Sequence, residues 1–345
     1  MRQPSTPTRV TTRDLLRVGV ICFGVSLLTL ASSASAAFPG RNGRIVFHAR
    51  YESSNNPCPQ QPESHPGEEG IFTMNPGGGD ATQLTDRTIS PNCSGFGGDG
   101  ISDGQPTFSP NGQRIAFTTF YSGLHTFASS IYLMRADGTA RHALTPQEGI
   151  EVDPAFSPNG KRIVFSDSYS VYTIRTDGSH KRRIVGPMGN PTFFQEDPTF
   201  FPGGKKIAFT GGNNVLTIRL DGTRRRRLTH NQNARSFDPD VSPDGRKIVF
   251  THSLPEPPGY EIRVMRADGT HDHHLADGSG AVFSPNGEKI AFTSLPPQTS
   301  AFPAQISVMH ASGSDQRVIT ANPLPFDYPD AASHFFTQPD WGPKP

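Results

Sequence analysis

The feature that most constrains the fold of this 345-residue chain is a repeat that recurs along nearly its whole length. The first half of the repeat reads P-x-F-S-P-[ND]-G and continues into an apolar–Phe pair, and the second half passes D-G-[TS] before it ends in L-T. Equivalent glycines occupy positions 43, 112, 160, 204, 245 and 287. Most of these steps are roughly 40 to 50 residues, a period typical of one β-propeller blade per repeat.

Each repeat contains four short runs of β-forming residues. Asn-Gly or Asp-Gly stands between the members of each pair of runs and accepts the positive φ that tight hairpin turns need. We therefore expect four strands per blade, named A to D from the axis outward. The last segment, QPDWGP at 338–343, has the pattern of a strand A without a following blade, whereas the first repeat lacks its strand A.

These two incomplete ends complement each other. If the C-terminal strand joins the N-terminal blade, the ring closes and no strand edge is left open. The sequence thus predicts an all-β, six-bladed β-propeller of four-stranded blades.

The repeats resemble those of the TolB-like propeller family, the WD-like β-propeller repeats that read P-x-W-S-P-D-G and later D-G-x-x-x-x-L-T. The resemblance covers roughly residues 38–345 and implies the fold. It does not imply one function, since the family includes binding proteins, peptidase propeller domains and sugar-processing enzymes. TolB carries an α/β domain before its propeller, and we expect that domain to be missing here.

The N-terminus has the pattern of a secretory signal peptide. Arg13 and Arg17 precede an apolar run from Val18 to Leu30, and small residues follow. The run is shorter than the roughly 20 residues that a membrane span needs, and Ala34-Ser35-Ala36 offers a cleavage site. We predict a signal peptide at 1–36, a propeller at 37–345, and an exported product, periplasmic or extracellular, without a membrane span.

Cleavage would also change the charge and the cysteine content. Loss of four arginines and one aspartate would move the formal charge from +1 to about −2, which argues against nucleic acid or an anionic membrane as partner. Cys58 and Cys93 would be the remaining cysteines. In an oxidising compartment such a pair favours a disulfide, and two separate thiols are the alternative.

Connections between the predicted strands gather on one face. Because the A–B and C–D turns share one end of the ring, the B–C and D–A connections must leave from the other, here called the upper face. Loops on a rigid frame usually carry binding, although a surface without function is the alternative. The longest B–C connections are expected near 49–70, 119–130, 252–260 and 294–304, and the longest D–A connections near 86–104, 186–196 and 321–338.

A polar residue precedes the proline of strand A in five of the blades, beside the predicted mouth of the central channel. Their oxygens suit a calcium ion or the hydroxyls of a sugar. Because Asp before Pro commonly bonds nearby backbone N–H groups, a structural role is the simpler interpretation. The ligand-binding candidates are Gln105, Asp153, Asp197, Asp238 and Gln338, with Gly280 in the sixth blade.

Two hairpins carry clusters of basic residues. His271 and His273, next to His274, could approach one metal if they alternate along a strand, although solvated histidines are the simpler interpretation. In the equivalent hairpin of another blade, alternation would send half of the run Arg224–Arg227 to each face. A solvated edge that blocks sheet pairing is the simpler role for these arginines, and binding of an anionic glycan is the sharper hypothesis.

Two recognised catalytic motifs, H-E-x-x-H and G-x-x-x-x-G-K, are missing from the sequence. We therefore favour a monomeric, non-catalytic scaffold without a cofactor that binds a protein or a cell-envelope polymer through its upper face. The alternative is a metal-assisted carbohydrate-active enzyme, a lyase or hydrolase, with its site at the channel mouth. Its scattered ligands would include His48, His125, His252 and His334.

Overall fold

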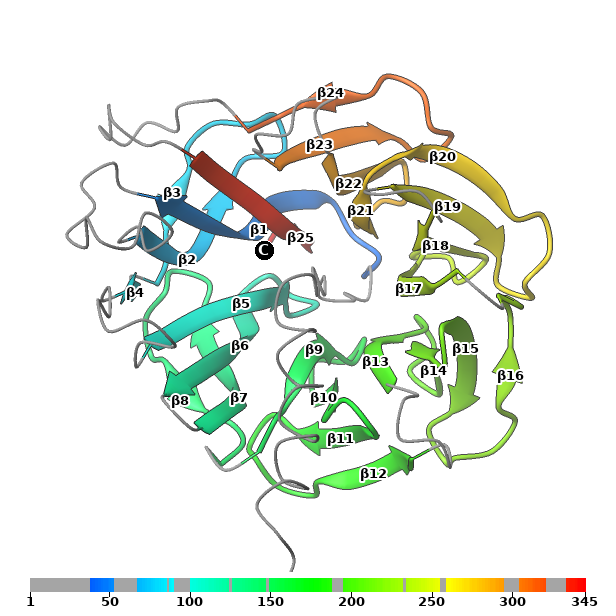
Figure 1. The fold of residues 1–345 in the computed structure, drawn as a ribbon, viewed down its shortest axis with the longest axis horizontal. Helices are drawn as coiled ribbons and strands as arrows, with labels where there is room; N and C mark the ends of the chain where they lie inside the picture. Colours follow the sequence, from blue (N-terminus) through cyan, green and yellow to red (C-terminus); the bar gives the residue numbers. More distant parts are fainter. Residues whose placement is uncertain are drawn as a thin grey trace, which may run out of the picture. The chain divides into compact units, whose positions relative to one another are not determined.

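The computed structural model describes residues 38–52, 67–85, 87–89, 100–123, 126–146, 149–187, 195–231, 234–254, 259–294, 304–320 and 333–345. Within these ranges, six antiparallel sheets surround a central axis, and each sheet is one blade (Figure 1). The predicted signal peptide, Cys58 and Cys93 lie outside the described residues.

The strands of each blade follow the order A to D. Blade 1 contains β25 (Ser333–Pro343), β1 (Asn42–Glu52), β2 (Gly67–Met74) and β3 (Thr82–Gln83), with β4 (Arg87–Ile89) also paired to β2. Blade 2 contains β5 (Gly100–Phe108), β6 (Arg114–Gly123), β7 (Thr126–Arg135) and β8 (His142–Ala143). Blade 3 contains β9 (Val152–Phe156), β10 (Arg162–Ser166), β11 (Val171–Arg175) and β12 (Arg182–Val185).

The remaining three blades repeat this order. Blade 4 contains β13 (Gln195–Phe200), β14 (Lys206–Gly211), β15 (Asn214–Arg219) and β16 (Arg226–Arg227). Blade 5 contains β17 (Ser236–Val241), β18 (Lys247–Ser253), β19 (Tyr260–Arg266) and β20 (His273–Asp277). Blade 6 contains β21 (Ser279–Phe283), β22 (Lys289–Ser294), β23 (Gln305–His310) and β24 (Arg317–Val318).

The ring closes as the sequence predicts. Strand β25 is the innermost strand of blade 1 and pairs antiparallel with β1, so that Ile45 faces Trp341 and Val46 faces Asp340. The first and last described strands therefore complete one blade, and they lie side by side in the ring (Figure 1).

The core lies between the blades and is built from the alternating apolar positions of strands A to C. The phenylalanine of each apolar–Phe pair in strand B is fully buried, and side chains of neighbouring sheets join in common clusters. Val46 and Ile71 of blade 1, for example, pack with Ile115 and Met134 of blade 2. The six buried strand-B residues are Phe47, Phe117, Phe165, Phe209, Phe250 and Phe292.

The A–B turns are longer than the two-residue turns that Asn-Gly predicts. In blade 2 the Gly112 N–H donates to the Ser109 carbonyl oxygen at 2.8 Å, and the Ser109 N–H donates to the Arg114 carbonyl oxygen at 2.8 Å. Gly112 has φ 67°, whereas Asn111 is not left-handed. The turn is therefore a four-residue loop in which the glycine alone takes the positive φ, because it lacks a Cβ.

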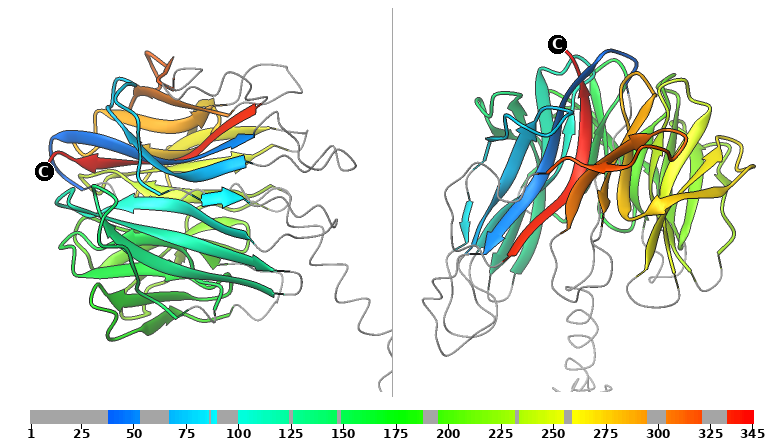
Figure 2. Two further views of the ribbon diagram at one scale, coloured as in Figure 1. Left: turned by 90° about the vertical axis from the view of Figure 1, so that its left-hand side faces the viewer. Right: turned by 90° about the horizontal axis from the view of Figure 1, so that it is seen from above.

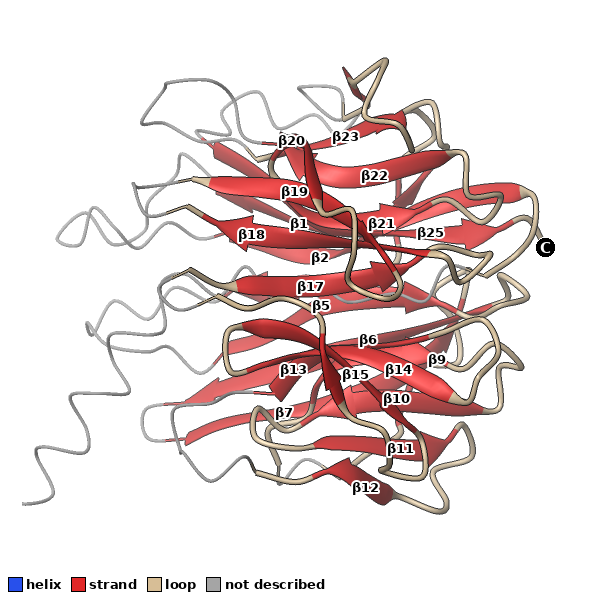
Figure 3. Ribbon diagram, turned by 90° about the vertical axis from the view of Figure 1, so that its right-hand side faces the viewer, coloured by secondary structure: helices blue, strands red, loops and turns tan. Residues whose placement is uncertain are grey.

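Blades 1 and 2 extend beyond the other blades on the upper face. Strands β6 and β7 pair as far as Gly123 and Thr126, so the loop predicted at 119–130 is mostly strand, and β5 begins at Gly100 inside the loop predicted at 86–104. Strands β9, β10 and β11 have only five residues each. The long strands are visible when the ring is viewed from the side (Figures 2 and 3).

The described part of the chain contains no helix that is long and apolar enough to cross a membrane.

Candidate functional site

The predicted ring residues share an unusual backbone conformation. Gln105, Asp153, Asp197 and Asp238 have φ values of 52°, 56°, 51° and 51°. At the same points the pairing between strands A and B shifts register, as a β-bulge does. A bulge re-aims the side chain it carries, and Asp tolerates the left-handed region better than most residues.

The re-aimed side chains connect each blade to the next. The Asp153 N–H donates to Gln105 Oε1 at 3.0 Å, and the Asp197 N–H donates to Asp153 Oδ2 at 3.2 Å. The Asp238 N–H in turn donates to Asp197 Oδ2 at 3.2 Å. Each ring side chain therefore accepts the equivalent backbone N–H of the following blade, from blade 2 to blade 5.

Hydroxyl groups of strand B hold the ring side chains from within their own blades. Thr118 donates to Gln105 Oε1 at 2.7 Å, and Thr210 donates to Asp197 Oδ2 at 2.9 Å. In blade 6 the ring position is Gly280, and its N–H donates to Thr251 Oγ1 of blade 5 at 3.0 Å. The Thr251 hydroxyl of blade 5 thus accepts the N–H of the following blade, as the Asp153 and Asp197 carboxylates do in blades 3 and 4.

The carboxylates of this ring are buried, which disfavours their ionised form. Burial raises the pKa of Asp153 well above its usual value, and the nearby Asp197 and Glu196 carboxylates raise it further. Burial likewise raises the pKa of Asp197, and Arg235 offsets part of that rise. Burial raises the pKa of Glu196 to about 7 although Arg235 contacts it. Asp197 Oδ1 has no hydrogen-bond partner in the described structure.

Several oxygens of the ring are already engaged in hydrogen bonds within the protein. The oxygens of Gln105 and Asp153 that could ligate calcium already accept hydrogen bonds from the protein. No group of three His, Cys, Asp or Glu within the described ranges is placed to hold a metal. The side chain of Gln338 is not described, and ligand binding by the ring stays a prediction.

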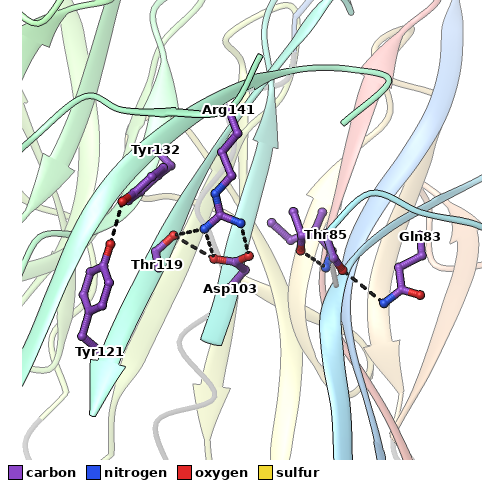
Figure 4. A network of polar contacts seen from close by, with 8 residues as sticks. Gln83, Thr85, Asp103, Thr119, Tyr121, Tyr132 and Arg141 are labelled. Carbon is purple, nitrogen blue, oxygen red and sulfur yellow. Dashed lines mark hydrogen bonds and ion pairs between the residues drawn. The ribbon is translucent and has the colours of Figure 1, made fainter. Parts of the chain in front are cut away.

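A second polar network, which the sequence reading missed, crosses the face of blade 2. Arg141 makes a bidentate ion pair with the buried Asp103, with both N–O distances 2.8 Å, and also donates to Thr119 (Figure 4). Its guanidinium carbon lies 5.0 Å from the centre of the Phe117 ring and 4.9 Å from that of Tyr132. The cation thus reaches from the outer edge of the blade across an aromatic pair to strand A.

Blade 3 contains the same arrangement with a lysine. Lys181 pairs with Glu151 at 2.7 Å and lies 5.3 Å from the Phe165 ring centre and 5.0 Å from that of Tyr172. Arg141 and Lys181 both stand four residues after the Asp of D-G-[TS]. When the repeats are aligned at the Asp of D-G-[TS], the two cations fall at the same position. Asp103 and Glu151, in strand A or just before it, are the acids that pair with them.

The histidine cluster does not form a metal site. Strand β20 begins at His273, so His271 lies in the preceding turn with φ 58°, and the predicted alternation along one strand is wrong. His273 Nδ1 lies 2.9 Å from the His271 carbonyl oxygen, and both side chains are exposed. His274 instead pairs with Asp277 at 3.2 Å.

The scattered histidines are only partly described. His48 Nε2 lies 4.0 Å from a Glu69 oxygen, and His252 Nδ1 lies 3.0 Å from Ser236 Oγ. Burial lowers the pKa of His252. His125 lies outside the described residues, and the side chain of His334 is not described.

The upper face carries most of the exposed large apolar side chains of the described structure. Ile101 lies at the upper end of β5, and Ile150 precedes β9. Tyr169 and Leu254 lie in B–C connections. These four side chains are 40% to 45% exposed, and the fifth of this kind, Val318, lies on an outer strand. The four side chains are thus distributed over blades 2, 3 and 5 of this face.

Comparison with known proteins agrees with this architecture. The family model described as TolB beta propeller domain matches residues 104–324. No curated protein matches the sequence significantly.

Among solved structures, TolB from Acinetobacter baumannii is similar, with a TM-score of 0.59 and 21% sequence identity over 88% of this chain and 67% of that chain. A putative TolB from Agrobacterium tumefaciens has a TM-score of 0.53 and 15% identity over 88% of this chain and 100% of that one. A chain in a nidogen/laminin complex has a TM-score of 0.54 and 12% identity over 86% of this chain and 98% of that one. At these identities the likeness shows a shared fold.

Proposed function

This chain belongs to the TolB β-propeller family, and from that premise we propose that it is an exported, non-catalytic scaffold whose upper face binds a protein. The observation that carries the proposal is the placement of Ile101, Ile150, Tyr169 and Leu254 on one face. Apolar side chains beside polar loops are typical of protein-binding surfaces, in which a dry centre is surrounded by a polar rim.

The frame beneath this face supports such a role. Inter-blade hydrogen bonds at Asp153, Asp197 and Asp238 fix the inner strands, and the Asp103–Arg141 pair fixes strand A to the outer edge of blade 2. A rigid frame lowers the entropic cost of binding, because the contact groups are already ordered before the partner arrives.

Metal-assisted carbohydrate chemistry at the channel mouth has less support. Oxygens of Gln105 and Asp153 accept inter-blade hydrogen bonds. His48 lies near Glu69, and His252 lies near Ser236. That activity stays a prediction with no described contact in its favour.

The proposal is tested by replacing the four apolar side chains together. The variant Ile101→Ser, Ile150→Ser, Tyr169→Ser, Leu254→Ser should keep its fold, because these side chains are largely exposed. Immobilised wild-type protein and variant are incubated with the native envelope fraction, and the captured proteins are identified by mass spectrometry. We expect a protein captured by the wild type to be lost by the variant, with its purified form binding at least about tenfold more weakly.

Val318→Ser is the matched control, since Val318 is 51% exposed but lies on the outer strand β24. It should capture the same protein as the wild type. If the purified partner bound the fourfold variant and the wild type equally well, the upper face would not be the docking surface.

A further inference from the structure

The outer edges of blades 3 and 4 carry a dense group of exposed arginines, which we call the arginine rim. The outer strands β12 and β16 lie at the periphery of the ring (Figure 1). The rim comprises Arg182 and Arg183 of β12, Arg224 and Arg225 of the adjoining C–D turn, and Arg226 and Arg227 of β16.

The structure corrects the expected distribution of this arginine run. Strand β16 contains only Arg226 and Arg227, paired with Thr217 and Leu216, and Arg224 has φ 54° in the turn. Alternation along a strand therefore does not divide the four side chains between two faces, and all four are exposed. The whole run is available at the edge of the molecule.

The rim continues across the boundary between the two blades. The Arg182 guanidinium of blade 3 donates to the carbonyl oxygen of Leu220, in the C–D turn of blade 4. At the same boundary a crevice of about 350 Å³ is lined by Arg162, Phe200 and Leu220. Leu220 therefore both lines this crevice and accepts a hydrogen bond from Arg182 of the rim.

The arginines of the rim differ from four other cations of the protein in having no carboxylate partner in the described structure. Arg141, Lys181, Arg235 and Arg263 each pair with a carboxylate. Within the described residues, no guanidinium group of the rim forms an ion pair. The predicted mature chain is slightly acidic, so the positive charge is a local feature of this edge.

We propose that the arginine rim binds a linear anionic polysaccharide. The planar guanidinium group presents two parallel N–H donors that match a carboxylate, and a row of such groups can engage successive charges of one polymer. None of the exposed large apolar side chains of the described structure lies on the rim. A single-stranded nucleic acid favours exposed aromatic rings for base stacking, and a membrane surface favours apolar side chains that insert, so both fit the rim less well.

The test uses carboxymethyl dextran as the probe and neutral dextran of the same length as its uncharged match. Binding is measured by isothermal titration calorimetry at low ionic strength and again at increasing salt. We expect the wild type to bind only the carboxylated polymer, with an affinity that falls as salt rises because counterions compete for the arginines. The variant Arg224→Gln, Arg225→Gln, Arg226→Gln, Arg227→Gln should bind at least about tenfold more weakly.

The control variant removes the same charge elsewhere. Arg41, Arg135, Arg317 and Lys344 are exposed and lie off the rim, so their replacement by Gln should leave the affinity close to that of the wild type. The fourfold upper-face variant should also retain binding, which separates this proposal from the proposed function. Equal weakening in the control and the rim variant would overturn the proposal, and so would tighter binding of an oligonucleotide or of phosphatidylglycerol vesicles than of carboxymethyl dextran.

Discussion

At the scale of single residues, the ring aspartates make their inter-blade hydrogen bonds in buried positions, where a charged carboxylate is unfavourable. Asp197 accepts the Thr210 hydroxyl and the Asp238 N–H through Oδ2, whereas Oδ1 is buried without a hydrogen-bond partner in the described structure. The inter-blade bonds need an acceptor at Oδ2, and an amide carbonyl oxygen can supply it as well as a carboxylate.

We expect Asp197→Asn to stabilise the protein at neutral pH, by about 1 kcal/mol or more, because it keeps the acceptor and removes a buried charge. The folded-state pKa of Asp197 is raised above its ordinary value of 3.8. The wild type therefore loses stability as the pH rises through the interval between the unfolded and folded pKa values, and Asn does not titrate. The advantage of the variant should be missing below about pH 3.8 and should grow above it, as measured by denaturant unfolding.

Asp137→Asn is the control for this series. Asp137 is exposed, and hydrogen bonds from Thr139 lower its pKa. Its replacement should not stabilise the protein at neutral pH. If Asp197→Asn were destabilising at pH 7 and neutral at pH 3, the Asp197 charge would be favourable in the fold, contrary to the burial argument.

At the scale of elements, β25 closes the ring through more than its pairing with β1. Asp340 accepts the backbone N–H of Phe108 in blade 2, and Trp341 is buried in an apolar cluster shared by blades 1 and 6. A Cβ at Gly342 would lie 2.5 Å from Phe108 Cδ2, so only glycine permits this approach. Strand β25 therefore pairs with β1 within blade 1 and also contacts blade 2.

Deletion of residues 339–345 should destabilise the protein strongly. It removes the Asp340–Phe108 bond and the buried Trp341, and loss of a buried aromatic side chain alone costs about 3 to 5 kcal/mol. The melting temperature measured by calorimetry should fall accordingly. Deletion of Lys344 and Pro345 alone, both exposed, is the matched control. An undiminished melting temperature in the longer deletion would contradict closure by this strand.

At the scale of the whole molecule, the ring is a chain of contacts between adjacent blades. Side-chain-to-backbone bonds run from blade 2 to blade 5 through Gln105, Asp153 and Asp197. Two residues after the ring position, Asp240 accepts the Phe283 N–H of blade 6 at 2.7 Å, as Asp340 accepts the Phe108 N–H of blade 2. Blade 1 differs, because its strands come from both ends of the chain. The segments 53–66, between β1 and β2, and 90–99, before β5, lie outside the described residues.

We predict that Cys58 and Cys93, in those two segments, form a disulfide in the exported protein. The bridge would close a loop of about 35 residues and stabilise the fold by roughly 3 to 4 kcal/mol in the entropic model. Thiol titration of the denatured, unreduced protein should find no free thiol, and the double variant Cys58→Ser, Cys93→Ser should melt at a lower temperature. Two titratable thiols would refute the bridge.

The repeat determined the six blades, their strand order and the closing strand, because each depends on local patterns: alternation, turn glycines and the spacing of equivalent residues. The same patterns placed Gln105, Asp153, Asp197 and Asp238 at one position of strand A. They did not show that these side chains reach the next blade, since the bulge that re-aims them is visible only when two strands are paired.

The tertiary structure alone decided which distant residues meet. Arg141 contacts Asp103 across two intervening strands and lies over the rings of Phe117 and Tyr132, which no local pattern connects to either charge. The arginine rim was visible in the sequence as Arg224–Arg227, but its extension to Arg182 requires two blades to lie side by side. Contacts between blades join residues about 40 positions apart, and at that distance the packing of sheets, which local sequence patterns do not encode, sets the geometry.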